Sequence, residues 1–170
     1  MQNNAPEYWQ RGPVEGIPPL LQPVAHALLQ ANAEIQDSVK DFPTEKLWQQ
    51  PAGLASAGFH LQHIAGVLDR LFTYSKGEAL TAQQLDYLSS EGKENKAIST
   101  PDLATALQQQ TDAAISYLKT VDETTLTQTR YVGRKQIPST VIGLLFHAAE
   151  HTMRHTGQLL VTARVLTETL

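Results

Sequence analysis

Three histidines recur at four-residue intervals near the C-terminus of the chain: His147, His151 and His155. On a helix, residues four apart lie one above the other on the same face, so two such imidazoles can bind one divalent metal ion. Two more histidines, His60 and His63, lie far upstream. Five of the six histidines therefore fall in two short windows, which predicts a metal site between two helical segments.

The spacing alone leaves alternatives open. Histidines four apart on a helix can also be solvated or hydrogen-bonded side chains. Each four-residue step turns by about 40° around the helix, so His147, His151 and His155 cannot point equally at one ion, and either neighbouring pair is permitted. His63 lies beside the apolar stripe of its own segment, where a lone histidine is more often a core residue. A histidine facing two others across a bundle would instead complete the three protein ligands typical of catalytic zinc sites.

Apolar residues at helical spacing predict the elements that must position these histidines. Four long helices are expected at residues 19–39, 56–75, 101–121 and 138–166. Ser56 is expected to cap the second of these helices, and Thr100 is expected to cap the third. The fourth helix is expected to begin at Pro138. A short helix is expected over 81–91, and a brief extended or hairpin excursion over 127–133. Four long helices and a long central connection containing a short helix predict an all-α four-helix bundle.

Length and composition predict one folded domain. The chain has 170 residues and 41% hydrophobic residues, which suffices for one sizeable core. Residues 1–16 contain several prolines and glycines, so we expect an irregular N-terminal arm there. The remaining residues, 17–170, are expected to form a single four-helix-bundle domain.

Charge and residue usage narrow the classes of function. The net charge is −4 and no basic run is visible, so we expect no nucleic-acid partner. Cysteine is absent, so a transition-metal site must use histidine or carboxylate ligands. The polar, proline-rich N-terminus is unlike a signal peptide, and the apolar stretches are shorter than the ~20 residues of a membrane helix. We therefore expect a cytoplasmic protein without a membrane partner.

Two stretches carry a more specific pattern: SAGFHLQHIAG at residues 56–66 and HTMRHTGQ at residues 151–158. They resemble the DinB-like or YfiT-like family of metal-dependent four-helix-bundle proteins, and the similarity extends over nearly the whole chain in helix order and loop lengths. That family places one metal-binding histidine on the second helix and two in a His-x-x-x-His-x-Gly-Gln stretch of the fourth. The resemblance therefore implies that His63, His151 and His155 are the metal ligands here.

The two remaining clustered histidines, His60 and His147, are not among these three ligands. His147 lies one turn before His151, and we expect it to form a wall of the metal pocket and to transfer a proton there. A buried core histidine is the alternative. His60, three residues before His63, could line the same pocket, although such a residue is more often partly exposed.

Other residues near the motifs have ordinary structural interpretations. Glu150 and Arg154 are four apart and predict a helical ion pair. Gly66 and Gly157 lie inside predicted helices, where glycine costs about 1 kcal/mol, so they are expected to permit the close approach of another helix.

The donor set leaves several reactions open. Three imidazoles bind zinc, nickel, iron or copper, and we expect zinc, with nickel as its rival. Such an ion could lower the pKa of water toward ~7 for hydrolysis, or bind a low-molecular-weight thiol as its thiolate. Characterised branches of the resembling family include thiol-dependent S-transferases and a maleylpyruvate isomerase. The resemblance thus implies thiol S-transferase-like chemistry on a small-molecule electrophile, and a homodimer.

Two other functions are compatible with a three-histidine metal site. One is a metal-dependent hydrolase. The other is a non-catalytic, metal-stabilised bundle that acts as a binding or stress-response module.

Overall fold

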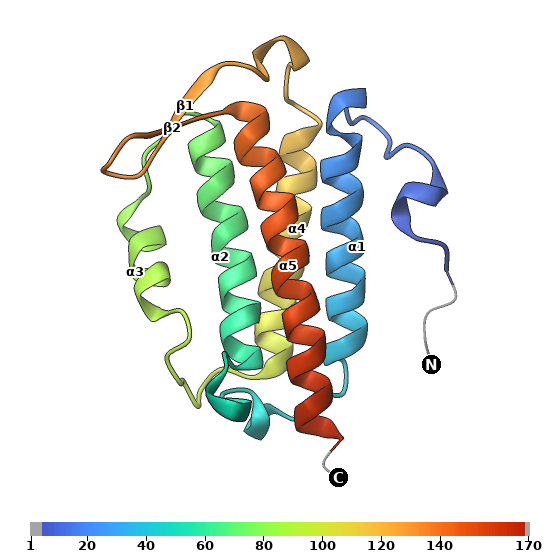
Figure 1. Ribbon diagram of the computed structural model, residues 1–170, viewed down its shortest axis with the longest axis vertical. Coiled ribbons are helices and arrows are strands. Elements are labelled where there is room, and N and C mark those ends of the chain that lie inside the picture. Colours follow the sequence, from blue (N-terminus) through green and yellow to red (C-terminus); the bar gives the residue numbers. More distant parts are fainter. Residues whose placement is uncertain (1–4, 169–170) are drawn as a thin grey trace.

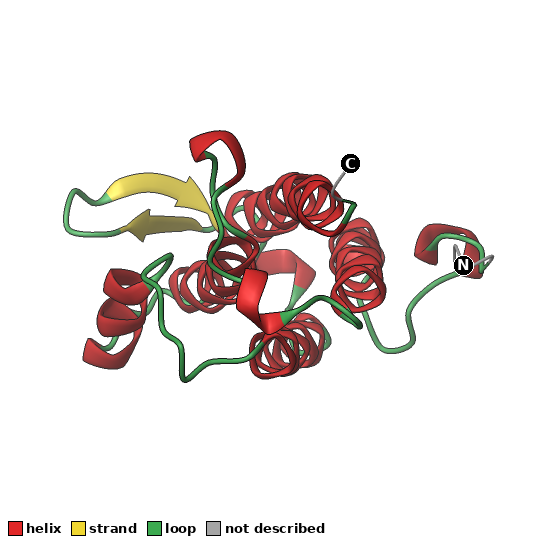
Figure 2. Ribbon diagram, turned by 90° about the horizontal axis from the view of Figure 1, so that it is seen from below, coloured by secondary structure: helices red, strands yellow, loops and turns green. Residues whose placement is uncertain are grey.

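Four long helices lie side by side around a common core in the computed structural model, which describes residues 5–168 (Figures 1 and 2). They are α1 (Gln22–Val39), α2 (Ala57–Ser75), α4 (Thr100–Leu118) and α5 (Val141–Thr167). In Figure 1, α1 and α5 run downward while α2 and α4 run upward. Helix α2 packs against α4 and α5, and α1 packs against the same two. The second and fourth long helices are therefore antiparallel neighbours.

Apolar side chains at helical spacing build this core. On α2, Leu61, Ile64 and Leu68 are fully buried, as are Leu145 and Leu159 on α5. Their spacings of three, four and multiples of a turn place them on one face of each helix, and burying that face drives the helices together. None of the helices within residues 5–168 is long and apolar enough to cross a membrane.

The long connection between α2 and α4 runs along the outside of the bundle and contains α3 (Ala82–Ser90) (Figure 1). Thr81 caps α3, because its side chain accepts a hydrogen bond from the backbone N–H of Gln84. Figures 1 and 2 show α3 outside the bundle, beside α2. The predicted short helix in the central connection is confirmed, and it covers the outer side of α2.

The predicted N-terminal cap is confirmed for α2 and wrong for α4. Ser56 caps α2, since its Oγ accepts a hydrogen bond from Phe59 N at 3.1 Å. The predicted cap of the third long helix, Thr100, is wrong. Ser99 is the cap, because its Oγ accepts from Asp102 N while the Asp102 carboxylate accepts from Ser99 N, which together form a capping box.

A two-stranded antiparallel hairpin joins α4 to α5. Strand β1 (Thr129–Val132) pairs with β2 (Ile137–Thr140). The predicted hairpin excursion is confirmed, but the predicted start of the last helix at Pro138 is wrong. Pro138 lies opposite Tyr131 in β2, a position that tolerates the missing N–H in a two-stranded ribbon. The helix begins three residues later, and Thr140 caps it.

Short 3-10 turns complete the described chain, at Tyr8–Arg11, Pro19–Leu21, Thr44–Lys46, Pro51–Gly53 and Glu123–Thr125. The first of them is held against α1, where Tyr8 N donates to Gln30 Oε1 at 3.0 Å. The predicted division into an arm at 1–16 and a domain at 17–170 stays a prediction, and residues 1–4 lie outside the described part.

Gly157 does not have the packing role that its position in a helix predicted. A Cβ added there would meet no atom of the described chain within 4 Å, whereas at Gly58 it would lie 2.8 Å from the Trp48 ring. Gly157→Ala should therefore raise the free energy of unfolding by about 0.5–1 kcal/mol, the usual gain from replacing a helical glycine. Urea unfolding measures this, with Gly58→Ala as the contrasting, destabilised variant. A loss of stability in Gly157→Ala would contradict the open surface seen here.

Candidate metal centre

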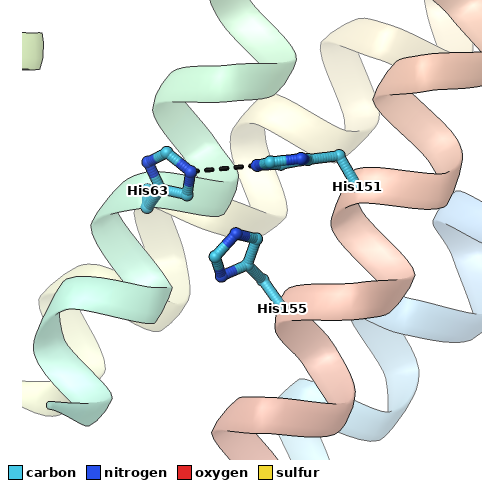
Figure 3. A group of neighbouring side chains, drawn as sticks. All are labelled: His63, His151 and His155. Atoms are coloured by element: carbon cyan, nitrogen blue, oxygen red, sulfur yellow. Dashed lines mark hydrogen bonds between the residues drawn. The ribbon is translucent and has the colours of Figure 1, made fainter. Parts of the chain in front are cut away.

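Three histidines from two neighbouring helices converge on one point. His63 extends from α2, and His151 and His155 extend from successive turns of α5 (Figure 3). Each offers one ring nitrogen, and these three nitrogens all lie within 4.8 Å of one another. His63 Nε2 and His151 Nε2 are 3.0 Å apart. The antiparallel packing of α2 against α5 thus brings together residues that are 88 positions apart in the sequence.

The spacing of these nitrogens suits one small divalent cation. Two nitrogens bound to a tetrahedral zinc ion at about 2.0–2.1 Å would lie about 3.3 Å apart, close to the observed separation. All three side chains are half-buried, so the site is enclosed by protein yet reachable from solvent. Histidine nitrogens without a carboxylate or thiolate ligand fit zinc or nickel better than magnesium or calcium, which prefer oxygen.

The second nitrogen of two of these rings is engaged elsewhere. His63 Nδ1 lies 2.7 Å from Glu91 Oε2. His155 Nδ1 lies 3.1 Å from Nδ1 of His60, which is 4% exposed. Both contacts leave Nε2 as the nitrogen available to an ion. The expectation that His60 is partly exposed is wrong, because α2 turns this ring inward against α5.

Burial disfavours the charged form of three clustered imidazoles, those of His60, His151 and His155. It lowers the pKa of His155 to about 4, and the neighbouring His63 and His151 add to that effect. Burial, followed by the proximity of His63, likewise lowers the pKa of His60 to about 4. The pKa of His151 is lowered by burial and then by His63 and His147. Neutral rings carry the lone pairs that a metal ion requires, so the lowered pKa values of His151 and His155 favour metal binding at neutral pH.

A sequence model of the DinB superfamily matches residues 27–159, which include every residue of this cluster. The chain belongs to the DinB superfamily. No curated protein sequence matches it.

Two solved structures share the fold of this DinB superfamily chain. One is a conserved protein from Enterococcus faecalis, with 18% identity and a TM-score of 0.67 over 88% of this chain and 98% of that one. The other is YfiT from Bacillus subtilis, with 15% identity and a TM-score of 0.67 over 93% and 94%. YfiT is described as a probable metal-dependent hydrolase with an unusual four-helix bundle topology. Both the predicted family resemblance and the predicted four-helix bundle are confirmed.

His147 lies beside the histidine cluster of this DinB protein but not within it. Its side chain is 50% exposed, so the alternative of a buried core residue is wrong. Its Nδ1 is 2.6 Å from Glu150 Oε1, and Glu150 also accepts from Arg154 at 2.8 Å, which confirms the predicted ion pair. His147, Glu150 and His151 form a second, more exposed group with metal-binding spacing that shares His151. A role for His147 in proton transfer stays a prediction.

Sequence reasoning missed Glu91, the carboxylate that contacts His63. The two residues are 28 positions apart, and no helical spacing relates them. Metal-binding histidines commonly donate their second N–H to a carboxylate, so such a partner could have been sought. The same connection also holds Glu78, Asp86 and Glu94, however, and only the three-dimensional path of α3 selects among them.

Proposed function

We propose that this protein is a metal-dependent enzyme in which His63, His151 and His155 bind one divalent ion, zinc or nickel. The observation that carries the proposal is the convergence of three ring nitrogens within 4.8 Å, from two helices of the bundle. The lowered pKa values of His151 and His155 support it, because these two rings then need no deprotonation before they bind an ion at neutral pH.

Hydrolysis of a small molecule is the first reaction that we propose. His63, His151 and His155 would hold the ion through three neutral ligands, and such an ion would supply Lewis-acid chemistry and lower the pKa of water. YfiT, which shares the fold, is described as a probable metal-dependent hydrolase. The His147 ring, half-exposed and hydrogen-bonded to Glu150, would carry a proton between the site and solvent.

Transfer of a low-molecular-weight thiol to a small electrophile is the second candidate. An ion with three neutral ligands would also favour binding of a thiolate, and the family resemblance implies this chemistry. The exposed apolar side chains of Phe146, Val161 and Val165 on α5, each more than half exposed, favour a homodimer. The cytoplasm is our proposed location.

Purification without added metal, followed by elemental analysis, tests the metal proposal. We expect about one zinc or nickel ion per chain. The chelated and reloaded protein is then assayed with small esters and amides, and with an aryl halide in the presence of several small thiols. Turnover that returns only with metal supports an enzyme. Turnover of the esters or amides would indicate hydrolysis, and turnover of the aryl halide with a thiol would indicate thiol transfer. Metal that raises the melting temperature without any turnover would favour the non-catalytic bundle, and a chain that binds no metal would exclude all three.

A further inference from the structure

Glu91 is an acidic residue with an unusually buried side chain. It directly follows α3 in a connection that is mostly exposed, yet its side chain is only 4% exposed. Removing a carboxylate from water costs several kcal/mol unless it is paired and hydrogen-bonded. Each of its oxygens has one such partner: Oε2 lies 2.7 Å from His63 Nδ1, and Oε1 accepts from Arg70 Nη1 at 2.5 Å.

The surface of α2 is shaped to receive this carboxylate. Gly66 lies one turn after His63 and has no side chain, and a Cβ added there would overlap the Glu91 carboxylate. It would also lie 2.5 Å from Arg70 Nη1 and 2.9 Å from the Tyr87 ring. The close approach predicted at Gly66 is thus confirmed, and the element that approaches is α3 with the Glu91 residue that follows it. Glycine is unfavourable inside a helix, so its place here is explained by the space that the Glu91 carboxylate occupies.

Further hydrogen bonds hold the α3 segment in place. Tyr87 Oη donates to the carbonyl oxygen of Gln62 at 3.2 Å, and Gly92 N donates to the Gln62 side chain at 2.9 Å. Gln84 Nε2 donates to Thr73 Oγ1 at 2.8 Å. The chain is therefore tied to α2 on both sides of Glu91, by side chains before it and by the Gly92 backbone after it, which defines the position of its carboxylate relative to His63.

We propose that Glu91 is a positioning residue for the metal centre, an inference that rests on the proposed function of His63 as a ligand. A carboxylate oxygen only accepts hydrogen bonds, so His63 donates through Nδ1–H. That contact fixes the tautomer whose Nε2 carries a lone pair, and it orients this lone pair toward His151 and His155. Arg70 occupies the other carboxylate oxygen and balances its charge.

A purely structural role makes a different prediction. If Glu91 served only to neutralise buried Arg70, replacing both residues with neutral side chains would restore whatever the loss of Glu91 alone removed. If Glu91 positions His63, the double replacement restores stability but not metal affinity. Glu91→Gln and the double variant Arg70→Met/Glu91→Gln therefore separate the two roles, and the double variant leaves no unpaired buried charge.

The test measures zinc and nickel affinity by competition with a chromophoric chelator. We expect about 10- to 100-fold weaker binding in Glu91→Gln, the usual loss for an outer partner of a ligating histidine. The double variant should be equally weak, and Glu94→Gln, an exposed acidic residue in the same connection, should bind like the unchanged protein. Unchanged affinity in Glu91→Gln, or its recovery in the double variant, would overturn the proposal.

A second readout does not depend on metal. Long-range nitrogen–proton NMR of the metal-free protein reports the tautomer of each histidine. We expect His63 to carry its proton on Nδ1 in the unchanged chain and to become a mixture of tautomers in Glu91→Gln. A proton on Nε2 in the unchanged chain would refute the role of Glu91. Failure of the unchanged chain to bind metal would refute the proposed function instead, so the two failures are distinguishable.

Discussion

Replacing His151 with alanine should abolish stoichiometric metal binding and all metal-dependent turnover. His151 Nε2 is 3.0 Å from His63 Nε2, and its ring centroid is 4.6 Å from that of His155, so it contacts both other proposed ligands. Its removal leaves two imidazoles, too few to hold an ion that keeps one open position. The loss of affinity should exceed the about 10- to 100-fold expected of an outer partner. Elemental analysis and chelator competition measure it.

Two further variants decide which histidines form the site. His63→Ala should lose metal as His151→Ala does, while His147→Ala should retain it. The opposite order would assign the ion to the more exposed group of His147, Glu150 and His151. His26→Ala serves as the control, because His26 lies on α1 and its ring contacts the carbonyl of Gly12 instead of the cluster. Circular dichroism of each metal-free variant verifies that the bundle still forms.

The sequence could predict the helices because each carries its own periodic apolar face. Leu61, Ile64 and Leu68 mark the buried side of α2 without reference to any other element. The same pattern places His63 near that side. Periodicity does not say which helices become neighbours, and the pairing of α2 with α5 was predicted from the two histidine windows and from the family resemblance. That pairing is what turns two separate histidine windows into one cluster.

Helix ends were harder to predict, because adjacent residues can offer the same capping group. Ser99 and Thr100 both carry a hydroxyl, and Asp102, three residues after Ser99, selects Ser99 through the reciprocal hydrogen bonds of a capping box. Pro138 suits the first turn of a helix as well as an edge strand. Pro138 is part of a strand because β2 pairs with β1. That pairing is a contact between two segments, and the local sequence around Pro138 does not reveal it.

The environment of the candidate site was the least predictable part. Glu91 approaches His63 because α3 folds back over α2, and His60 meets His155 because both rings turn inward. Neither contact follows a spacing rule. Both engage the nitrogen that an ion would not use, so the features that tune the candidate ligands are those that only the tertiary structure supplies.

Acid should destabilise the metal-free protein between about pH 6.5 and pH 4. Folding lowers the pKa of His60 and of His155 from 6.5 to about 4, with burial as the main cause. In this interval the unfolded chain binds protons at both residues and the folded chain does not, so stability falls as the pH falls. Above pH 6.5 neither state is protonated there, and below about pH 4 both are, so this contribution to the slope vanishes at each end.

Urea unfolding at a series of pH values, with a chelator present, measures the slope. Wyman linkage converts it into the extra protons bound on unfolding, which should approach one for each of the two histidines. His60→Phe should reduce this number by about one, because it replaces the buried ring with one that does not titrate. Equal slopes in the two proteins would contradict burial of a neutral His60.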